Sequence, residues 1–324
     1  MLANFRKNWT ALWNPNMYHG WGKEQNYFEG WYFKWVDPEE QIVLAIIPGI
    51  SKGPDGEQHA FVQVFDGVAC KAWYLRFEAS EFKPHADQFA LDLGNNYFSA
   101  EMVRLDLPNL KGEIRMQALH PWPKMLGAPG IMGWYSFVPF MQCYHGVVSL
   151  HHRLEGSLEF EGRTISFTGG TGYGEKDWGR SFPSAWIWMQ SNHFGVDEPI
   201  CLMASVANIP WLGSSFVGYI VGFLFEGELH RFATYTGAKM SASYEDKGVR
   251  VVFYDKKKRL EIFAIPAAGT DLVSPLSGEM TGKVNESLQA TLEVRFEENG
   301  VERFRGTGRN AGLELAGALN TLIG

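Results

Sequence analysis

The chain has 324 residues, a net charge of -7 and a pI near 5.8. A chain of this length buries a hydrophobic core without help from disulfides, and it suits two domains. Its acidic balance leaves no basic surface for nucleic acid. The three cysteines, Cys70, Cys143 and Cys201, are isolated and lack metal-ligand spacing, so we expect free thiols and no zinc site.

The N-terminal residues include two early positive charges but no apolar segment long enough for a signal peptide. We therefore expect a cytoplasmic protein. Asn14 and Pro15 are typical of a turn that ends any short helix before it. The apolar residues 209–225 approach transmembrane length, but Pro210 and the glycines within them favour a buried β-hairpin.

From Phe28 onward the sequence is almost wholly strand-like. Short β-branched or aromatic runs such as EGWYFKWV, IVLAIIPGI and AFVQVF are separated by turn-forming segments such as DPEEQ and SKGPDGEQ. The segment HPWPKMLGAPGIMG, residues 120–133, is typical of a long loop. The pattern predicts an all-β protein.

The second half of the chain repeats the order of the first. WYFKWV with IVLAIIPGI corresponds to WIWMQSNHF with ICLMASVANI, VQVFDGVACKAWYLRFE to VGFLFEGELHRFATYTG, and SLEFEGRTISFTGGTG to VRFEENGVERFRGTG. Turns of β-hairpins can converge by chance, but three correspondences in one order indicate duplication. The strand spacing predicts two tandem antiparallel β-barrel domains, residues 1–170 and 171–324.

The strongest chemical signal lies in residues 169–194, GGTGYGEKDWGRSFPSAWIWMQSNHF. In the alignment of the two copies, Glu175 and Asp177 fall opposite Ala311 and Leu313, so the fold itself does not require the two carboxylates. We therefore consider both as candidate catalytic acids. They precede a segment with Trp or a polar amide at every second residue, which is typical of a strand lining a ligand cavity.

A third candidate acid, Glu29, lies among aromatic residues. If residues 28–35 form a strand, Glu29 shares one face with Trp31, Phe33 and Trp35. A carboxyl group desolvated among rings would hold its proton to a higher pH and could act as an acid.

Each of these acids also has a structural interpretation. Glu175 and Asp177 could lie in a surface turn or form an ion pair with Lys176 or Arg180. Glu29 could cap backbone amides at a strand start or pair with a basic residue. The residues alone leave these alternatives open.

His145, His151 and His152 cluster in the sequence, but we do not expect a metal site there. On a regular strand His145 and His151 share a face while His152 points away, and no acidic or cysteine ligand completes a recognisable set. His145 beside Tyr144 could instead be a polar member of a pocket or a structural histidine. No serine or cysteine nucleophile has a hydrolase context, and GGTGYG does not follow a βαβ pattern.

Two of these segments resemble hallmark motifs of the tocopherol cyclase family: YFEGWYF (Tyr27 to Phe33) and GEKDWG (Gly174 to Gly179). The following FPSAWIWMQSNHF is similar to the family pattern FP-x-x-W-x-W-x-Q-x-N-x-F. The resemblance runs from Pro15 to Glu314. It implies two lipocalin-like β-barrels, in a superfamily that includes carotenoid hydratases.

Characterised plant members of that family protonate a prenyl-chain alkene, after which the phenol oxygen attacks the tertiary carbocation. The resemblance therefore implies a proton donor, a water-poor aromatic cavity, no redox cofactor and a small hydrophobic ligand such as an isoprenoid or prenyl quinol. It leaves open whether Glu29, Glu175 or Asp177 donates the proton. The plant motif often has Asn at the position of Asp177, which favours Glu175 or Glu29.

The residues expected to bind the ligand are aromatic or polar members of these segments. They are Trp31, Phe33, Tyr144, His145, Tyr173, Trp178, Trp186, Trp188, Gln190 and Asn192. The alternative function is a lipid carrier that uses the same cavities without chemistry, because the fold does not decide between the two. Peripheral membrane contact through residues 134–140 or 211–216 is a further expectation, and no protein partner is identifiable.

Overall fold

The computed structural model describes residues 2–323, which divide into two compact units. The first unit comprises Met1–Asp66, Lys71–Phe182 and Leu272–Lys283, and the second comprises Gly67–Cys70, Pro183–Asp271 and Val284–Gly324. The chain first passes into the second unit's main part after Phe182 rather than after residue 170. The reason is that residues 171–179 form a strand inside the first sheet.

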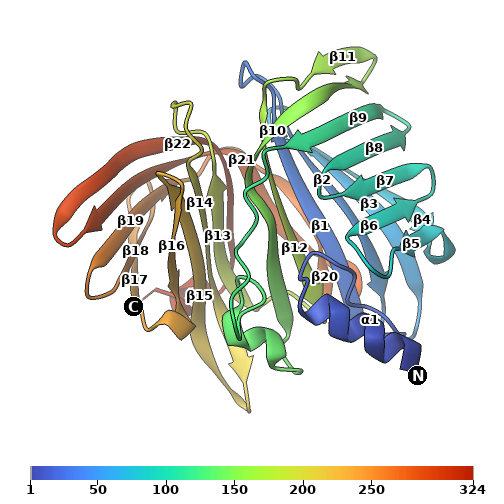
Figure 1. The fold of residues 1–324 in the computed structure, drawn as a ribbon, viewed down its shortest axis with the longest axis horizontal. Helices are drawn as coiled ribbons and strands as arrows, with labels where there is room; N and C mark the ends of the chain where they lie inside the picture. Colours follow the sequence, from blue (N-terminus) through green and yellow to red (C-terminus); the bar gives the residue numbers. More distant parts are fainter. Residues whose placement is uncertain (1, 324) are drawn as a thin grey trace. The chain divides into compact units, whose positions relative to one another are not determined.

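The first unit contains the helix α1 (Leu2–Leu12) and a twelve-stranded antiparallel sheet (Figure 1). Its strands are β1 (Tyr27–Val36), β2 (Val43–Lys52), β3 (Gln58–Asp66), β4 (Lys71–Glu78), β5 (Phe82–Pro84), β6 (Ala90–Leu93), β7 (Asn96–Ser99), β8 (Met102–Leu107), β9 (Leu110–Gln117), β10 (Cys143–Phe160), β11 (Arg163–Ser166) and β12 (Thr171–Gly179). The hydrogen-bonded order is β4-β3-β2-β1-β12-β10-β9-β8-β7-β6-β5, and β11 pairs with β10.

The second sheet has ten strands. They are β13 (Ala185–Ser191), β14 (Cys201–Trp211), β15 (Ser214–Phe225), β16 (Glu228–Ala233), β17 (Lys239–Glu245), β18 (Gly248–Tyr254), β19 (Lys258–Ile265), β20 (Thr270–Leu276), β21 (Glu279–Glu298) and β22 (Val301–Gly317). The order is β16-β15-β14-β13-β22-β21-β19-β18-β17, and β20 pairs with β21. Short 3-10 helices occur at Ala79–Glu81, Gly133–Phe137, Thr234–Thr236 and Leu319–Thr321.

The two strand orders correspond along most of their length. Strands β1 to β4 of the first sheet and β13 to β16 of the second sheet lie in consecutive order. In the first sheet β1 pairs with the late strand β12, and in the second sheet β13 pairs with the late strand β22. The shared order agrees with the repeat of segments seen in the sequence. Two closed barrels are not confirmed, because closure requires the end strands to pair, and among residues 2–323 the pairing leaves β4 and β5 at the ends of one sheet and β16 and β17 at the ends of the other.

Period-two alternation explains how each sheet builds its core. Trp31, Phe33 and Trp35 alternate along β1 and all belong to the first hydrophobic core, as predicted. In β13 the core residues are instead Ile187 and Met189. The apolar residues 209–225 form the predicted hairpin, in which β14 and β15 are joined by an exposed two-residue turn. Within residues 2–323 no helix is long and apolar enough to cross a membrane.

Candidate functional site

The two motif segments lie side by side because β1 pairs with β12. Trp31 lies opposite Lys176, and Glu29 lies opposite Trp178. Successive side chains of a strand point to opposite faces, so Lys176 and Trp178 lie on one face of β12 while Glu175 and Asp177 lie on the other. The GEKDWG segment therefore contributes to two separate polar clusters, one on each face of the sheet.

The last glycine of the motif is required by its backbone. Gly179 has φ of +149°, and a Cβ at this position would lie 2.4 Å from the carbonyl oxygen of Gln142. A side chain would be strained in this conformation and would collide with the backbone where β10 begins. Gly179 thus allows the end of β12 to lie close to the backbone of Gln142.

The first cluster surrounds Glu29, whose side chain is fully buried. Its carboxylate forms an ion pair with Lys176 and accepts hydrogen bonds from the backbone N–H of His19, at 3.0 Å to each oxygen. The hydroxyl of Tyr27 donates to Glu29 Oε2 at 2.5 Å. The ammonium group of Lys176 also donates to the carbonyl oxygen of Met17 and lies 2.9 Å from His19 Nδ1. Every charged atom here has a partner.

These contacts determine the protonation of the cluster. Burial by itself raises the pKa of Glu29, but the charge of Lys176 and the hydrogen bonds from His19 outweigh it, and the net pKa is lowered. Burial lowers the pKa of Lys176 to about 8 against the opposing effect of Glu29. Burial and Lys176 lower the pKa of His19 to about 4, so this imidazole is neutral. It accepts from Lys176 at Nδ1 and donates from Nε2 to the carbonyl oxygen of Ala11.

Of the two interpretations of Glu29 that the sequence left open, the structure supports the one in which Glu29 pairs with a basic residue and accepts from backbone amides, and its pKa is lowered rather than raised. Aromatic rings do surround the site, since the ammonium group of Lys176 lies 4.6 Å from the ring centroid of Trp31 and 4.7 Å from that of Trp178. The buried Lys176 supplies the counter-charge, as in the interpretation that Glu29 pairs with a basic residue. Glu29 is an ionised partner of Lys176 rather than a neutral acid.

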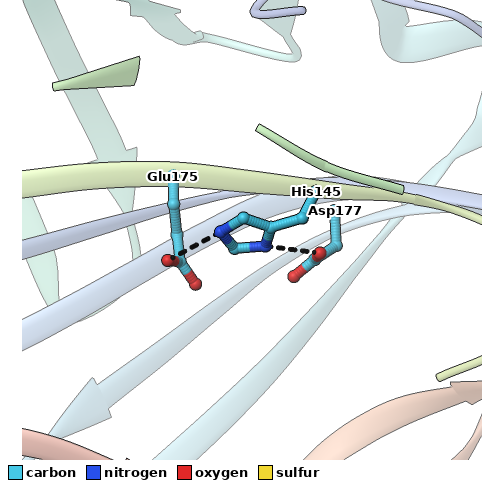
Figure 2. Close-up of side chains that lie close together, drawn as sticks. All are labelled: His145, Glu175 and Asp177. Carbon is cyan, nitrogen blue, oxygen red and sulfur yellow. Dashed lines mark hydrogen bonds and ion pairs between the residues drawn. The ribbon is translucent and has the colours of Figure 1, made fainter. Parts of the chain in front are cut away.

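The second cluster lies on the opposite face of β12 (Figure 2). The imidazole of His145, from β10, lies between two carboxylates: Nδ1 is 2.9 Å from Asp177 Oδ1, and Nε2 is 3.3 Å from Glu175 Oε2. The contact to Asp177 is a hydrogen bond, whereas the contact to Glu175 is an ion pair without hydrogen-bond geometry. The hydroxyl of Tyr173 donates to Glu175 Oε2 at 2.5 Å.

The charge of His145 follows from this arrangement. Burial lowers its pKa, but Glu175 and Asp177 together outweigh burial and raise the pKa to about 10. At neutral pH the ring is therefore a buried imidazolium flanked by two carboxyl groups. His145 and Glu175 are buried, and Asp177 is partly exposed.

The sequence spacing shows no acid that completes a ligand set with His145, but in the structure β12 places Glu175 and Asp177 beside it. Donor atoms of His145, Glu175 and Asp177 lie within 4.8 Å of one another, which is close enough to hold a metal ion. The ring, however, presents one nitrogen to each carboxylate instead of directing one donor towards a common point (Figure 2). This geometry fits a shared proton better than a metal ion.

A cavity of about 300 Å³ lies in the first unit. It is lined by residues 14–17, residues 87–89, parts of the 121–130 loop and Val147. Lys176 binds the carbonyl oxygen of Met17 in this lining, and Trp31 Nε1 donates to that of Asn16 at 2.9 Å. Val147 lies opposite Glu175 in the pairing of β10 with β12. The cavity lining therefore contacts the Glu29 cluster and includes the strand-pairing partner of Glu175.

Other predicted ligand-binding residues of the first unit form stacked aromatic contacts. Trp31 stacks on the cavity residue Phe89 at 5.3 Å, and Phe33 stacks on the same ring at 6.2 Å. Tyr144 stacks on Trp178 at 5.4 Å, on the ring that also stacks with His19. These rings provide apolar surface next to the polar clusters.

The remaining predicted residues belong to the second unit. Trp186 Nε1 donates to Glu314 Oε2 at 2.5 Å, and the ring of Trp188 covers Gly312. Gln190 is fully buried and donates to the sulfur of Cys201, and Asn192 is also buried. Along β13 these side chains alternate with the core residues, as the period of two predicted.

Three participants are not predicted from the sequence: His19, Tyr27 and the role of Lys176 as partner of Glu29. No periodic signal marks His19, which contacts Glu29 through its backbone N–H. A signal for Lys176 was present, since its immediate neighbours on a strand must point to the opposite face. Applied to GEKDWG, that rule separates Lys176 from both adjacent acids.

Comparison with known proteins gives one family and several related structures. Residues 102–317 match the family described as Tocopherol cyclase-like. Over 109 residues the chain is 29% identical to a probable tocopherol cyclase, chloroplastic, of Oryza sativa subsp. japonica and to a tocopherol cyclase, chloroplastic, of Zea mays. In each case the match covers 32% of this chain, and it spans 23% of the length of the plant protein.

Solved structures extend the similarity to most of the chain. CghA has a TM-score of 0.56 at 10% identity, covering 90% of this chain and 89% of CghA. A proposed AttH of Nitrosomonas europaea has a TM-score of 0.51 at 16% identity, covering 88% and 91%. Kievitone hydratase of Nectria haematococca has a TM-score of 0.51 at 9% identity, covering 89% of both chains. At these identities the likeness concerns the fold.

Proposed function

Because the chain belongs to the tocopherol cyclase-like family, we propose that it protonates an alkene of a prenylated phenol or related isoprenoid lipid and thereby cyclises or hydrates it. The observation that carries this proposal is the buried imidazolium of His145 between Glu175 and Asp177. The enzyme names of the plant relatives and of kievitone hydratase agree with this class of reaction.

The reaction needs one proton and no net oxidation. The π electrons of the alkene form a new C–H bond with the donated proton, and a tertiary carbocation remains at the other alkene carbon. In cyclisation the phenol oxygen forms a C–O bond to that carbon, and its own proton returns to the acid site. In hydration a water molecule takes the place of the phenol oxygen. The proton balance closes in both cases.

The cluster has the means to supply that proton. In the proposed reaction one of the two carboxyl groups beside the imidazolium is in its acid form when it donates the proton. The neighbouring imidazolium then balances the negative charge of the carboxylate left after donation. We propose Glu175 and Asp177 as the donor pair, His145 as the group that holds the counter-charge, and Tyr173 as the residue that orients Glu175.

Glu29 has a different role in this proposal. Its carboxylate is ionised and its oxygens are occupied by Lys176, His19 and Tyr27. We propose that it positions Lys176 and the adjacent cavity wall. The aromatic rings of Trp31, Phe33, Tyr144 and Trp178 lie on the Lys176 face of the sheet, opposite the donor pair, and stay proposed ligand-binding residues there. Trp186, Trp188, Gln190 and Asn192 stay proposed ligand-binding residues.

The test is turnover in deuterated water. The purified protein is incubated with a panel of prenyl quinols and carotenoids, and the products are analysed for a chromanol or hydrate with one carbon-bound deuterium. Glu175→Gln and His145→Gln are expected to lower turnover by roughly 100-fold or more, as for loss of general acid catalysis. Glu228→Gln, at an exposed position of the second unit, is the matched control and keeps full turnover.

Absence of turnover across the whole panel contradicts the proposal. In that case the lipid carrier becomes the better interpretation, and extraction of the purified protein followed by mass spectrometry identifies a bound lipid. A carrier would also retain ligand binding when Glu175 and Asp177 are replaced by their amides.

A further inference from the structure

The first unit exposes large aromatic side chains on two segments that are far apart in the sequence. Phe5 and Trp9, one helical turn apart on α1, are 67% and 56% exposed. Trp134 and Phe137, in the 3-10 helix Gly133–Phe137, are 48% and 39% exposed. Side chains of this size are usually covered, so contiguous exposure indicates an interaction surface.

The two segments form one surface. The ring of Trp13 lies 6.5 Å from that of Trp9 and 5.3 Å from that of Phe137, with edge-on geometry in both pairs. Nearby, Lys124 Nζ donates to Asn14 Oδ1 at 2.5 Å. We define the aromatic patch as Phe5, Trp9, Trp13, Trp134 and Phe137.

The charge around the aromatic patch differs from that of the whole chain. The net charge is -7, yet residues 1–23 contain Arg6, Lys7 and Lys23 and no acidic residue. The loop at residues 118–142 contains Lys124 and also lacks acidic residues. Basic side chains beside exposed Trp and Phe are typical of segments that lie in the interface of an anionic bilayer.

The same two segments form part of the cavity wall. Residues 14–17 directly follow α1 and the Trp13 turn, and Pro121, Trp122, Lys124, Pro129 and Gly130 belong to the loop that leads to Trp134. An apolar ligand that resides in a bilayer would therefore find the cavity next to the surface that contacts the bilayer.

We propose that the aromatic patch docks on the surface of an anionic lipid bilayer, with Trp9, Phe5 and the Gly133–Phe137 segment inserted at the headgroup level. The rings contribute apolar burial, and the indole N–H groups stay hydrogen-bonded to headgroups or water. Arg6 and the neighbouring lysines attract the anionic lipids. This docking does not depend on the acid chemistry at His145.

The test is co-sedimentation of the full chain with vesicles of phosphatidylcholine and with vesicles in which part of the phosphatidylcholine is replaced by phosphatidylglycerol. The protein is expected to bind the second kind more tightly. Phe5→Ser with Trp9→Ser is expected to weaken that binding by roughly tenfold or more, because burial of each ring is lost. Tyr244→Ser removes an equally exposed aromatic from β17 of the second unit and is expected to leave binding unchanged.

The charge contribution is tested separately. Arg6→Gln is expected to weaken binding to the anionic vesicles roughly fivefold and to leave the weak binding to phosphatidylcholine unchanged. Near-ultraviolet circular dichroism checks that each variant is folded. Glu175→Gln is expected to bind vesicles like the unmodified protein, so a failure of docking is distinguishable from a failure of the proposed catalysis.

Three outcomes overturn the proposal. The first is binding to neither kind of vesicle, and the second is equal weakening by the aromatic-patch and Tyr244 variants. The third is self-association in light scattering that Phe5→Ser with Trp9→Ser abolishes, without vesicle binding, which assigns the aromatic patch to contact with a second copy of the chain.

Discussion

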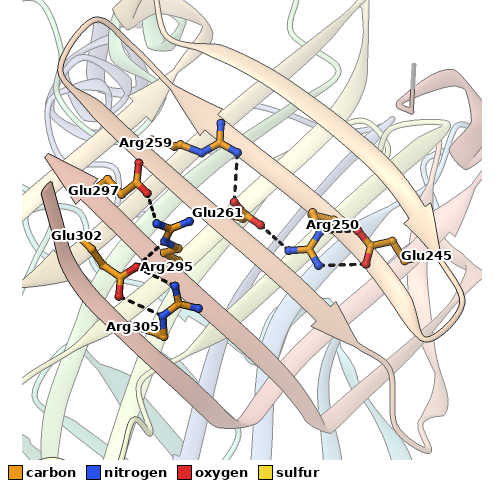
Figure 3. Close-up of polar contacts among 8 residues, drawn as sticks. All are labelled: Glu245, Arg250, Arg259, Glu261, Arg295, Glu297, Glu302 and Arg305. Atoms are coloured by element: carbon orange, nitrogen blue, oxygen red, sulfur yellow. Dashed lines mark hydrogen bonds and ion pairs between the residues drawn. The ribbon is translucent and has the colours of Figure 1, made fainter. Parts of the chain in front are cut away.

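The first unit buries one group of ion pairs around β12, whereas the second unit carries most of its ion pairs on an exposed sheet surface. That surface includes eight charged side chains of β17, β18, β19, β21 and β22 that alternate in sign across neighbouring strands (Figure 3). They are Glu245, Arg250, Arg259, Glu261, Arg295, Glu297, Glu302 and Arg305. In the first unit, Glu29 and Lys176 are fully buried.

The same residue types therefore have different consequences in the two regions. An exposed pair is screened by water and loses side-chain entropy when it forms, so each contact adds little stability. A buried charge loses its hydration, and removal of its partner leaves it uncompensated. The buried clusters at β12 are therefore expected to be stable only when each charge keeps its partner. The exposed network of the second unit is expected to lose little stability when a partner is removed.

A comparison of β12 with β22 sharpens this difference. The two strands take the same place in their sheets, next to β1 and β13 respectively. Where the sequence repeat aligns Glu175 and Asp177, β22 has Ala311 and Leu313, which lie in the second hydrophobic core. A strand at this place in the order can thus form without carboxylates, which supports a functional rather than an architectural origin for those of β12.

The largest effect is expected from removing one half of the buried pair. Lys176→Met leaves Glu29 ionised and buried without its counter-charge, and the free energy of unfolding is expected to fall by about 3–5 kcal/mol. Urea unfolding followed by intrinsic fluorescence measures the change. The double variant Glu29→Gln with Lys176→Met is the control, and it is expected to recover part of the loss because no buried charge remains. A loss of equal size in both variants would contradict this account.

A smaller, pH-dependent effect is expected at His145. Its pKa rises from 6.5 to about 10 on folding, so the folded state holds more protons than the unfolded state between these values. The stability that the imidazolium contributes is complete below pH 6.5 and is lost as the pH rises through 10. The free energy of unfolding should decline in this range by at most about 1.4 kcal/mol per pH unit.

The control for this prediction is His145→Gln, whose free energy of unfolding should lack that decline. Lys176 acts in the opposite direction, because its folded pKa of about 8 lies below its ordinary value of 10.5 and the unfolded chain binds more protons between the two. Since both proteins contain Lys176, its contribution cancels in their difference. Parallel pH profiles for the two proteins would show that His145 is not protonated in this environment.

Local patterns predicted much of this fold correctly. The alternation of Trp31, Phe33 and Trp35 identified a face of β1 that packs in the core, and the glycines within residues 209–225 identified a hairpin rather than a membrane span. The order of the repeats anticipated the shared strand order. All of these follow from side-chain periodicity and turn chemistry, which act over a few residues.

Pairings between distant strands could not be predicted in the same way. Glu29 and Lys176 are 147 positions apart in the sequence, and only the pairing of β1 with β12 makes them partners. Likewise, His145 acquired its acids through the pairing of β10 with β12, and the register of that pair shifts between Val147 and His152. Closure of a sheet also depends on such non-local geometry, which explains why alternation alone suggested closed barrels.

The smallest effect on stability is expected from a substitution in the exposed ion-pair network of the second unit. Glu302 accepts hydrogen bonds from both Arg295 and Arg305, and these bonds hold its pKa at about 2. Its carboxylate is nevertheless in contact with solvent, so Glu302→Gln is expected to leave the urea midpoint within experimental error at moderate salt. The same measurement at low salt should reveal a slight loss, because screening is weaker there. A loss as large as that of Lys176→Met would mean that this surface is covered in solution, and burial would then no longer distinguish the two networks.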